Sequence, residues 1–439
     1  MAKTRNRISG IWVEGFKSIC SKQHIAIRPL TVLAGANSAG KSSVMQPLLL
    51  LKQTVEASGD PGALLLNGEN VKFTRADQLL AKGSGDKFGV GIELSDGQTL
   101  GLLFRKAARG FELSEMDYGS QDESFTIKPS MSHDSIMKVL PKPWKTMHRQ
   151  IGKDAKSDMQ WAVRRERCFF VFEMVSSDDA SRRVRFGPFG VSPSQSFVSH
   201  IEGIIHLPGL RGNPQRTYPK TAGGPSYQGT FEVYVASVVA EWQSNGGKGK
   251  LDELAHALET MALTWKVKAE PVDDTQVELK VGRLTHARQG GAHDLVSIAD
   301  VGFGVSQTLP VLVALLAARP GQMVYLEQPE IHLHPLAQRR LAKVLQQAVG
   351  RGVVAVVETH SAILLRELQT LIATGDLRKN DVAMHWLARN EEGETAVVTA
   401  ELDDNGSFGT WPVDFDEIDM ESEDAYLDAV EARRSNHGE

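Results

Sequence analysis

One stretch near the start of the chain constrains its fold more than any other. Residues 35–43 read GANSAGKSS, which fits the G-x-x-x-x-G-K-[ST] pattern of a phosphate-binding loop, or P-loop. The apolar run before it, residues 29–34, predicts a buried strand, and the apolar run after it, residues 44–51, predicts a buried helix. Strand, glycine-rich turn and helix, in this order, are the context in which this pattern binds nucleotide phosphates.

The residue types in this loop suit a nucleoside triphosphate bound with Mg²⁺. Gly35 and Gly40 let the backbone curl so that successive N–H groups point into one hollow, and the start of the following helix adds partial positive charge. We expect Lys41 to reach the β- and γ-phosphates and the Ser42 hydroxyl to bind Mg²⁺. The predicted nucleotide-binding residues are Gly35, Ala36, Asn37, Ser38, Ala39, Gly40, Lys41, Ser42 and Ser43.

The bulk composition is that of an ordinary globular protein, with 41% hydrophobic and 23% charged residues. The net charge of −5 gives no overall field that would attract nucleic acid or a membrane. Cys20 and Cys168 are too few for a disulfide framework, which suits a reducing compartment. The amino terminus lacks an apolar signal core, and the longest apolar run, residues 309–318, is too short to span a bilayer. We therefore expect a cytoplasmic protein without a membrane segment.

The pattern of elements changes along the chain. Short alternating runs after residue 67 predict strands, including a hairpin at 88–104, whereas strands alternate with helices after residue 206. The second pattern predicts a parallel sheet with its site at the carboxyl ends of the strands, and hence an α/β fold. The expected divisions are a first part with the P-loop (1–66), an inserted β-rich and basic region (67–205), a second part of the same domain (206–400) and an acidic tail (401–439).

Three charged stretches allow more than one interpretation. Residues 138–167 hold nine Lys or Arg against three acids, with two tryptophans among them. This pattern is compatible with a surface that binds nucleic acid. It is also compatible with a solvated helical face or with a surface for an acidic protein partner. Residues 206–229 are predicted to be an ordered loop, whose Arg211 and Arg216 either meet phosphate or are structural. Residues 401–431 hold twelve acids and no Lys or Arg, which predicts solvated surface, a mimic of nucleic acid or a dock for a basic partner.

A nucleotide site also needs an acid for the metal ion and a polar group that places the attacking water. Glu327 ends an apolar strand and is the candidate metal acid. Gln328 follows it where a general base is expected, but an amide can only orient a water molecule. Glu330 lies two residues further on and could substitute as the base. His360 ends the neighbouring strand and could sense the γ-phosphate.

Several of these motifs together resemble known ATPase families. Asn37 gives the P-loop the form G-x-N-x-x-G-K-S, which is typical of ABC-type ATPases, and GFKS at 15–18 resembles the opening of SMC and RecF proteins. EQPEIHLHP at 327–335, followed by ETHS at 358–361, is similar to the OLD-like AAA ATPases of bacteria. These ATPases are common in anti-phage defence operons, and the similarity is greatest to their stand-alone members.

The resemblance implies an ABC-type ATPase head that dimerises head to tail with ATP held between the subunits, or forms a higher homo-oligomer. Residues 35–43 would then be Walker A, Glu327 and Gln328 the Walker B positions, and His360 the switch histidine. The signature segment would lie at 304–307 and contact the partner's γ-phosphate. The residues expected to do so are Gly304, Ser306 and Gln307.

This chain departs from the family pattern at two places. The signature segment is not LSGGQ, and Walker B has Glu327 for the usual Asp and Gln328 for the usual Glu. Hydrolysis is therefore expected to be slow or to rely on Glu330.

Three functions are compatible with the sequence. The first is an ATPase sensor and scaffold that controls a nuclease or toxin supplied by another chain, because no Toprim-like acidic cluster is evident here. The second is a nucleotide switch that hardly hydrolyses, with Gln328 as its distinguishing residue. The third is a repair ATPase that acts directly on DNA ends, as RecF and SMC heads do.

Overall fold

The computed structural model describes residues 6–121, 123–140, 145–146, 159–176, 192–221, 224, 226–244, 246–286 and 294–409. At its centre is a sheet in the order β10-β15-β16-β3-β17-β18, in which all neighbours are parallel except β17 and β18. Its strands are β3 (Leu30–Ala34), β10 (Ile205–Leu207), β15 (Met323–Glu327), β16 (Val354–Thr359), β17 (Val382–Arg389) and β18 (Thr395–Thr399). The predicted mixed α/β fold with a parallel sheet is confirmed.

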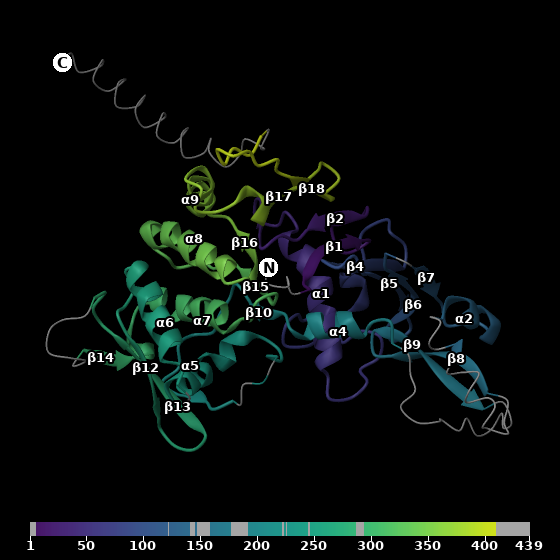
Figure 1. The fold of residues 1–439 in the computed structure, drawn as a ribbon, viewed down its shortest axis with the longest axis horizontal. Helices are drawn as coiled ribbons and strands as arrows, with labels where there is room; N and C mark the ends of the chain where they lie inside the picture. Colours follow the sequence, from purple (N-terminus) through teal and green to yellow (C-terminus); the bar gives the residue numbers. More distant parts are fainter. Residues whose placement is uncertain are drawn as a thin grey trace, which may run out of the picture.

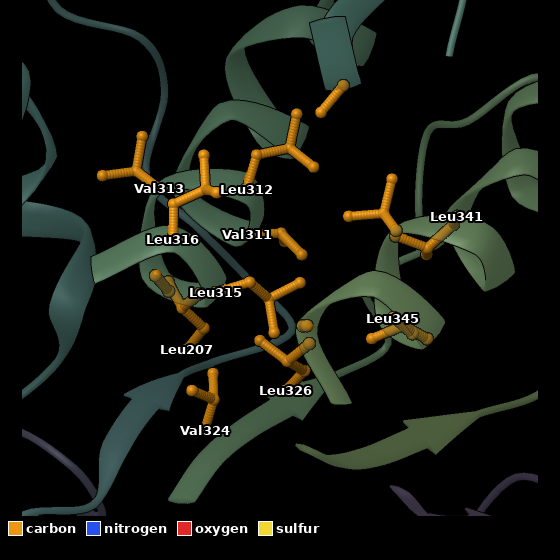
Figure 2. Packing of buried hydrophobic residues seen from close by; sticks show 14 of the residues in the cluster. Leu207, Val311, Leu312, Val313, Leu315, Leu316, Val324, Leu326, Leu341 and Leu345 are labelled. Carbon is orange, nitrogen blue, oxygen red and sulfur yellow. The ribbon is translucent and has the colours of Figure 1, made fainter. Parts of the chain in front are cut away.

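The central sheet separates two hydrophobic cores. Val324 and Leu326 of β15 face the first core, whereas Tyr325 between them faces the second, because side chains alternate along a strand. Figure 2 shows the side chains of Leu315 and Leu345 gathered near Val324 and Leu326 in the first core. The helices that supply this core are α5 (Val235–Ser244), α6 (Lys248–Thr260), α7 (Phe303–Ala317), α8 (Pro335–Gly350) and α9 (Ala362–Ala373). The second core contains α1 (Lys41–Glu56), which begins at the P-loop.

An antiparallel sheet in the order β2-β1-β4-β5-β6-β7 packs in the second core. Its strands are β1 (Ile8–Glu14), β2 (Gln23–Ala26), β4 (Lys87–Leu94), β5 (Thr99–Ala107), β6 (Gly110–Gly119) and β7 (Ser124–Ile127). The predicted hairpin at 88–104 is confirmed by the antiparallel pairing of β4 with β5. Because β1 pairs with β4, this sheet crosses the division expected at residue 66.

Smaller elements complete both sides of the molecule (Figure 1). The remaining strands are β8 (Met159–Glu166), β9 (Phe169–Ser176), β11 (Tyr218–Pro219), β12 (Val267–Pro271), β13 (Gln276–Gly282) and β14 (Leu295–Ser297). The remaining helices are α2 (His133–Val139), α4 (Gln195–Glu202) and the 3-10 turns η1 (Ala76–Gln78), η2 (Phe231–Tyr234), η3 (Ile298–Asp300) and η4 (Lys379–Asp381). None of the helices in the described ranges has the length and apolar character needed to cross a membrane.

The structure corrects two sequence-based interpretations in part. The basic stretch 138–167 is not a helical face throughout, because residues 159–166 form strand β8 paired with β9. The segment 206–229 is not a continuous loop, because it begins in β10, which pairs with β15 at the edge of the central sheet. A strand of three residues is too short to show periodicity in the sequence, so its pairing partner defines it.

Candidate nucleotide-binding site

The loop between β3 and α1 has a shape that only glycine allows at two positions. Gly35 has a φ of +146°, and a Cβ atom there would lie 2.2 Å from the carbonyl oxygen of Leu387. Gly40 has a φ of +100°, and its Cβ would lie 2.3 Å from the hydroxyl oxygen of Thr395. This Thr395 hydroxyl also donates to the carbonyl of Ala39 at 2.8 Å. Strands β17 and β18 therefore pack against the loop, and they leave no room for a side chain at Gly35 or Gly40.

The inner surface of the loop offers donors to an anion. Gly40 caps α1 without a side-chain hydrogen bond, so the first N–H groups of the helix have no side-chain partner there. Ala36, Asn37 and Ser38 are exposed. Lys41 is buried, and its Nζ donates to the carbonyls of Gly35 at 3.1 Å and Ala36 at 2.9 Å. Burial lowers the pKa of Lys41, although the nearby carboxylates oppose this shift.

Two carboxylates lie in register at the ends of adjacent strands, Glu327 on β15 and Glu358 on β16. Glu358 accepts hydrogen bonds from the hydroxyl of Tyr325 and, at 2.9 Å, from the hydroxyl of Ser42. Burial, together with the charge of Glu327, raises the pKa of Glu358 to about 7. The Ser42 hydroxyl, predicted to bind Mg²⁺, therefore contacts the acid on β16.

Glu327 is held by a different set of donors. Its Oε1 lies 3.2 Å from Nε2 of the buried His206 on β10, and its Oε2 accepts the backbone N–H of Gly209 at 3.1 Å. Nδ1 of His206 in turn lies 3.0 Å from the side-chain oxygen of Asn70. Burial would raise the pKa of Glu327, but the bonds and charge of His206 and the Gly209 N–H lower it overall.

Glu330 and His360 meet at the turn after β16. One oxygen of the buried Glu330 accepts the hydroxyl of Thr359 at 2.6 Å and the backbone N–H of His360 at 2.9 Å. Its other oxygen is buried and has no hydrogen-bond partner among the residues that the structure describes. Nδ1 of His360 lies 3.5 Å from Nζ of Lys41. Burial and the Lys41 charge lower the pKa of His360, which favours the neutral ring.

Gln328 and the predicted signature segment are joined by one buried arginine. Gln328 has a φ of +43° and donates its N–H to the carbonyl of Glu358 at 2.9 Å. Arg211 is buried and donates to the carbonyls of Gln307 at 2.9 Å, Glu327 at 3.1 Å and Gln328 at 3.4 Å. The Gln307 side chain donates to the carbonyl of Gly212 at 3.2 Å. The structural interpretation of Arg211 is therefore favoured over phosphate contact.

The remainder of the signature segment lies at the start of α7. Gly304 is half-buried and Ser306 is buried, with its hydroxyl bonded to the carbonyl of Phe303 at 3.3 Å. Phe303 is 51% exposed, and its ring lies near the His332 ring, with the ring centroids 5.6 Å apart. The P-loop, the two acids, Glu330 and His360 thus come together. Within the described part of the chain, Gly304 and Ser306 form no hydrogen bond with the P-loop.

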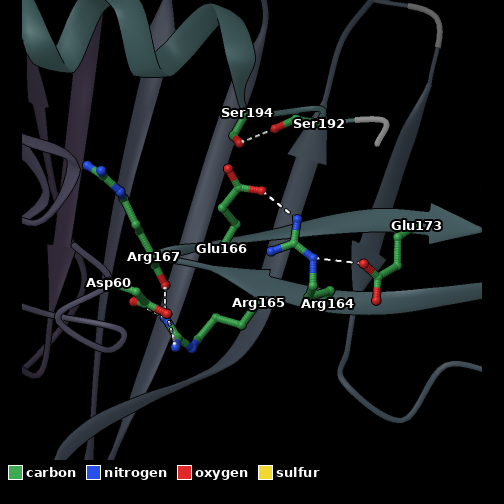
Figure 3. Close-up of polar contacts among 8 residues, drawn as sticks. All are labelled: Asp60, Arg164, Arg165, Glu166, Arg167, Glu173, Ser192 and Ser194. Carbon is green, nitrogen blue, oxygen red and sulfur yellow. Dashed lines mark hydrogen bonds and ion pairs between the residues drawn. The ribbon is translucent and has the colours of Figure 1, made fainter. Parts of the chain in front are cut away.

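The predicted basic surface is only partly described. Arg164 donates to Glu173 at 2.8 Å and to Glu166 at 2.7 Å, and Arg165 donates to Asp60 at 2.7 Å. Figure 3 shows these residues on and beside the β8–β9 hairpin. These cations are partly neutralised within the chain, which weakens the nucleic-acid interpretation for this hairpin. Four other basic residues of the stretch, at 142, 149, 153 and 156, lie outside the described residues.

Sequence reasoning assigned no role to four residues of this site. Tyr325 reads as an ordinary core residue of an apolar strand, and His206 lies in a strand too short to predict. Glu358 belongs to the ETHS motif, and its position before His360 is a signal that could have identified it. Asn70 comes from a distant loop, and no local pattern connects it with the site.

Comparison with known proteins gives a partial assignment. Residues 227–366 match the family described as "AAA domain, putative AbiEii toxin, Type IV TA system". This segment includes Glu327, Gln328 and His360 but not the P-loop, which the fold brings to the same edge of the sheet. The chain thus contains an AAA-type domain. No curated protein matches the sequence significantly.

Three solved structures of SMC heads are similar in overall arrangement. An SMC head bound to the C-winged helix domain of ScpA has 11% identity and a TM-score of 0.48, over 90% of this chain and 98% of that chain. The SMC head from Thermotoga maritima has 11% identity and a TM-score of 0.40, over 90% and 99%. A Pyrococcus furiosus SMC head with an extended coiled coil, bound to the C-terminal domain of ScpA, has 12% identity and a TM-score of 0.43, over 91% and 97%.

Proposed function

We propose that this chain is an ABC-type ATPase that binds ATP with Mg²⁺, hydrolyses it slowly, and closes as a homodimer to control a partner effector in anti-phage defence. The observation that carries the proposal is the meeting of the P-loop, Ser42, two strand-end carboxylates and His360 at one edge of the central sheet. A cytoplasmic location remains an expectation from the sequence.

The residues at this edge fit a nucleotide and its metal ion. The helix start without a side-chain cap and the buried Lys41 suit phosphate oxygens. The hydroxyl of Ser42 and the carboxylate of Glu327 or Glu358 supply the hard oxygen donors that Mg²⁺ prefers. When bound, Mg²⁺ would neutralise phosphate charge. The residues of this chain would hold the phosphates, fix Ser42 and place a water molecule.

Slow hydrolysis follows from the groups available to activate water. Gln328 can orient a water molecule but cannot take its proton. One oxygen of Glu330 accepts hydrogen bonds from Thr359 and His360. Among the described residues the second oxygen has no partner, so it is the one that could take a proton from water. We therefore assign the base role to Glu330 and a positioning role to Gln328. Gln328 also favours a second candidate function, a nucleotide switch with almost no turnover.

Turnover of two variants separates these functions. Gln328→Glu adds a carboxylate at the expected base position, so we expect its turnover to rise at least about tenfold. Glu330→Gln should lower the turnover of the wild-type protein by a similar factor. Steady-state phosphate release measures both. Wild-type turnover near zero that Glu330→Gln leaves unchanged would favour the switch.

Dimer closure is supported by apolar side chains beside the site. Leu210 is 88% exposed, Phe303 51%, Leu336 45% and Ile363 37%. Leu210 follows β10, and the other three lie in the first turns of α7, α8 and α9. Exposed apolar groups beside a site favour a protein interface. A second copy covering this edge would bring its signature residues Gly304, Ser306 and Gln307 toward the nucleotide.

Light scattering with and without ATP tests this closure. Phe303→Asp should abolish an ATP-dependent dimer, because it adds a charge at the expected interface. The matched control is Val272→Asp, since Val272 is 56% exposed and lies beyond β12, in a different sheet. Equal loss of the dimer in both variants, or no dimer in the wild type, would refute closure at this edge.

The effector role is the most specific part of the proposal. It is supported by the family resemblance and by the toxin named in the matched family description. ATP-dependent co-purification with the product of a neighbouring gene is the expected result. Salt-dependent DNA binding without such a partner would instead favour a repair ATPase, for which the paired Arg164 and Arg165 offer little support.

A further inference from the structure

We infer that Glu358 is the positioning residue for the Ser42 hydroxyl, and that Glu327 does not have this role. The inference rests on the proposed function, because it concerns how the same site prepares for a nucleotide bound with Mg²⁺. It departs from the sequence-based expectation, in which Glu327 and Ser42 together form the metal site.

The order of strands places Glu358 nearer to the P-loop. Strand β16 lies between β15 and β3, and Glu358 pairs with Leu33 just before the loop. Glu327 lies in register with Glu358 but one strand further away, and adjacent strands are about 4.8 Å apart. Both carboxylates belong to the face of the sheet that carries α1, because Tyr325, two residues before Glu327, faces the same core as α1.

The contact with Ser42 has a direct chemical consequence. A serine hydroxyl has one proton and two lone pairs. The Ser42 hydroxyl lies 2.9 Å from Oε2 of Glu358, which can only accept when ionised. A hydroxyl that donates its proton to a carboxylate keeps its lone pairs for a cation. Glu358 therefore presents Ser42 in the orientation that metal binding requires, before any nucleotide arrives.

Glu327 is already held by other parts of the chain. One of its oxygens lies against His206 and the other accepts the N–H of Gly209. The Tyr325 hydroxyl donates to Glu358 and also helps to lower the pKa of Glu327. It therefore links the two acids. Through these bonds Glu327 is fixed from the β10 side, away from Ser42.

The charge of Glu358 also lacks a fixed counterion. Within the described part of the chain, no lysine or arginine forms an ion pair with Glu358, and Lys41 donates to backbone carbonyls instead. Buried carboxylates are normally paired with a cation. The alternative is that Glu358 only satisfies two buried hydroxyls and has no part in metal binding.

A double-mutant cycle on Ser42 and Glu358 distinguishes these roles. The dissociation constant of the non-hydrolysable analogue AMP-PNP is measured by calorimetry with Mg²⁺ and with EDTA. The EDTA value divided by the Mg²⁺ value gives the contribution of the metal to binding. Glu358→Gln should reduce this ratio by about 10–100-fold, as loss of a partner of a metal ligand does, and leave the EDTA value within about twofold. Ser42→Ala should give a similar loss. Because the two act as one unit, the double variant should lose no more than Ser42→Ala alone.

Two further variants complete the experiment. Glu367→Gln is the matched control, because Glu367 is a buried carboxylate of α9 that pairs with Arg339 outside the site; its ratio should equal that of the wild type. Glu358→Asp shortens the side chain and serves in the cycle if Glu358→Gln does not fold. An unchanged ratio in the Glu358 variant, or losses that multiply in the double variant, would overturn the inference. Wild-type protein that binds no AMP-PNP in either condition would refute the proposed function instead.

Discussion

The two ends of α1 hold buried charges in opposite arrangements. At its carboxyl end, Lys52 is paired with Glu56, its Nζ also donates to the carbonyl of Tyr227 at 2.8 Å, and Glu56 accepts the N–H of Gly229 at 3.1 Å. At its amino end, Ser42 faces Glu358, which lies in register with a second carboxylate on β15. The first group pairs one cation with one carboxylate. The second brings two carboxylates together, and the nearby Lys41 donates to backbone carbonyls.

We expect this difference to separate the end that stabilises the fold from the end that would bind the proposed nucleotide. Removing one member of a buried pair leaves an uncompensated charge, so the Lys52 end is expected to govern stability. Two nearby carboxylates raise the free energy of the protein without ligand, a cost that is typical of functional sites. A change at the carboxyl end should therefore lower stability, whereas a change at the amino end should weaken nucleotide binding and affect stability less.

The largest expected effect is on stability, from Lys52→Met. Glu56 would be left buried without its partner, and the free energy of unfolding should fall by about 3–5 kcal/mol. Urea unfolding measures this change. The double variant Lys52→Met/Glu56→Leu should recover most of the loss, because it removes both charges. A single variant as stable as the wild type would show that the pair has no such role.

The next effect is on binding, from Lys41→Ala. Loss of the charged donor from the P-loop should weaken ATP binding by at least about 100-fold, since each hydrogen bond to a charged group contributes about 1.5–3 kcal/mol. Stability should change little, because burial already disfavours the charged form of Lys41. Calorimetric titration and thermal unfolding measure the two quantities, with the exposed Lys343→Ala as control. A large loss of stability in Lys41→Ala would remove the contrast between the two ends.

A third effect concerns pH, in EDTA and without nucleotide. The pKa of Glu358 is raised to about 7 in the folded protein, above the value of 4.5 for a free side chain. The folded state therefore holds a proton that the unfolded state releases, so stability should fall as pH rises from about 4.5 to 7. The loss should reach about 2–3 kcal/mol, because one pKa unit corresponds to about 1.4 kcal/mol. Glu358→Gln should lack this slope, and a parallel pH profile in both proteins would contradict it.

The smallest effect is expected at the exposed ion pair between Arg165 and Asp60. This pair joins the β8–β9 hairpin to the loop after α1, but both side chains are partly exposed. Arg165→Ala should therefore lower stability by less than about 1 kcal/mol, and salt should reduce the difference further. Urea unfolding at low and high salt measures both values. If Arg165→Ala lost as much stability as Lys52→Met, the exposed ion pair would be as important as the buried one, which would contradict this expectation.

Much of the fold was predictable because its signals are local. The buried strand, the glycine-rich turn and the helix of the P-loop are contiguous, and the alternation after residue 206 predicts the parallel sheet. Glu327, Gln328, Glu330 and His360 could be proposed because strand ends meet at one edge.

The rest of the site depends on contacts between distant segments. Asn70 reaches His206 across 136 positions of the sequence, and Thr395 reaches Ala39 across 356. The choice between Glu327 and Glu358 depends on strand order, which periodicity alone does not reveal. A sequence pattern indicates that an acid ends a strand, but only the sheet shows which strand lies beside the P-loop.

The buried guanidinium of Arg211 links two segments that have different tasks. It donates to the carbonyl of Gln307 near the start of α7 and to the carbonyls of Glu327 and Gln328 at the end of β15. Neither segment can shift without stretching these bonds or moving the other. If a second copy contacts the start of α7, as proposed, any shift of that segment would be passed on to Gln328, the residue proposed to place water. Assembly and turnover would then be linked through Arg211.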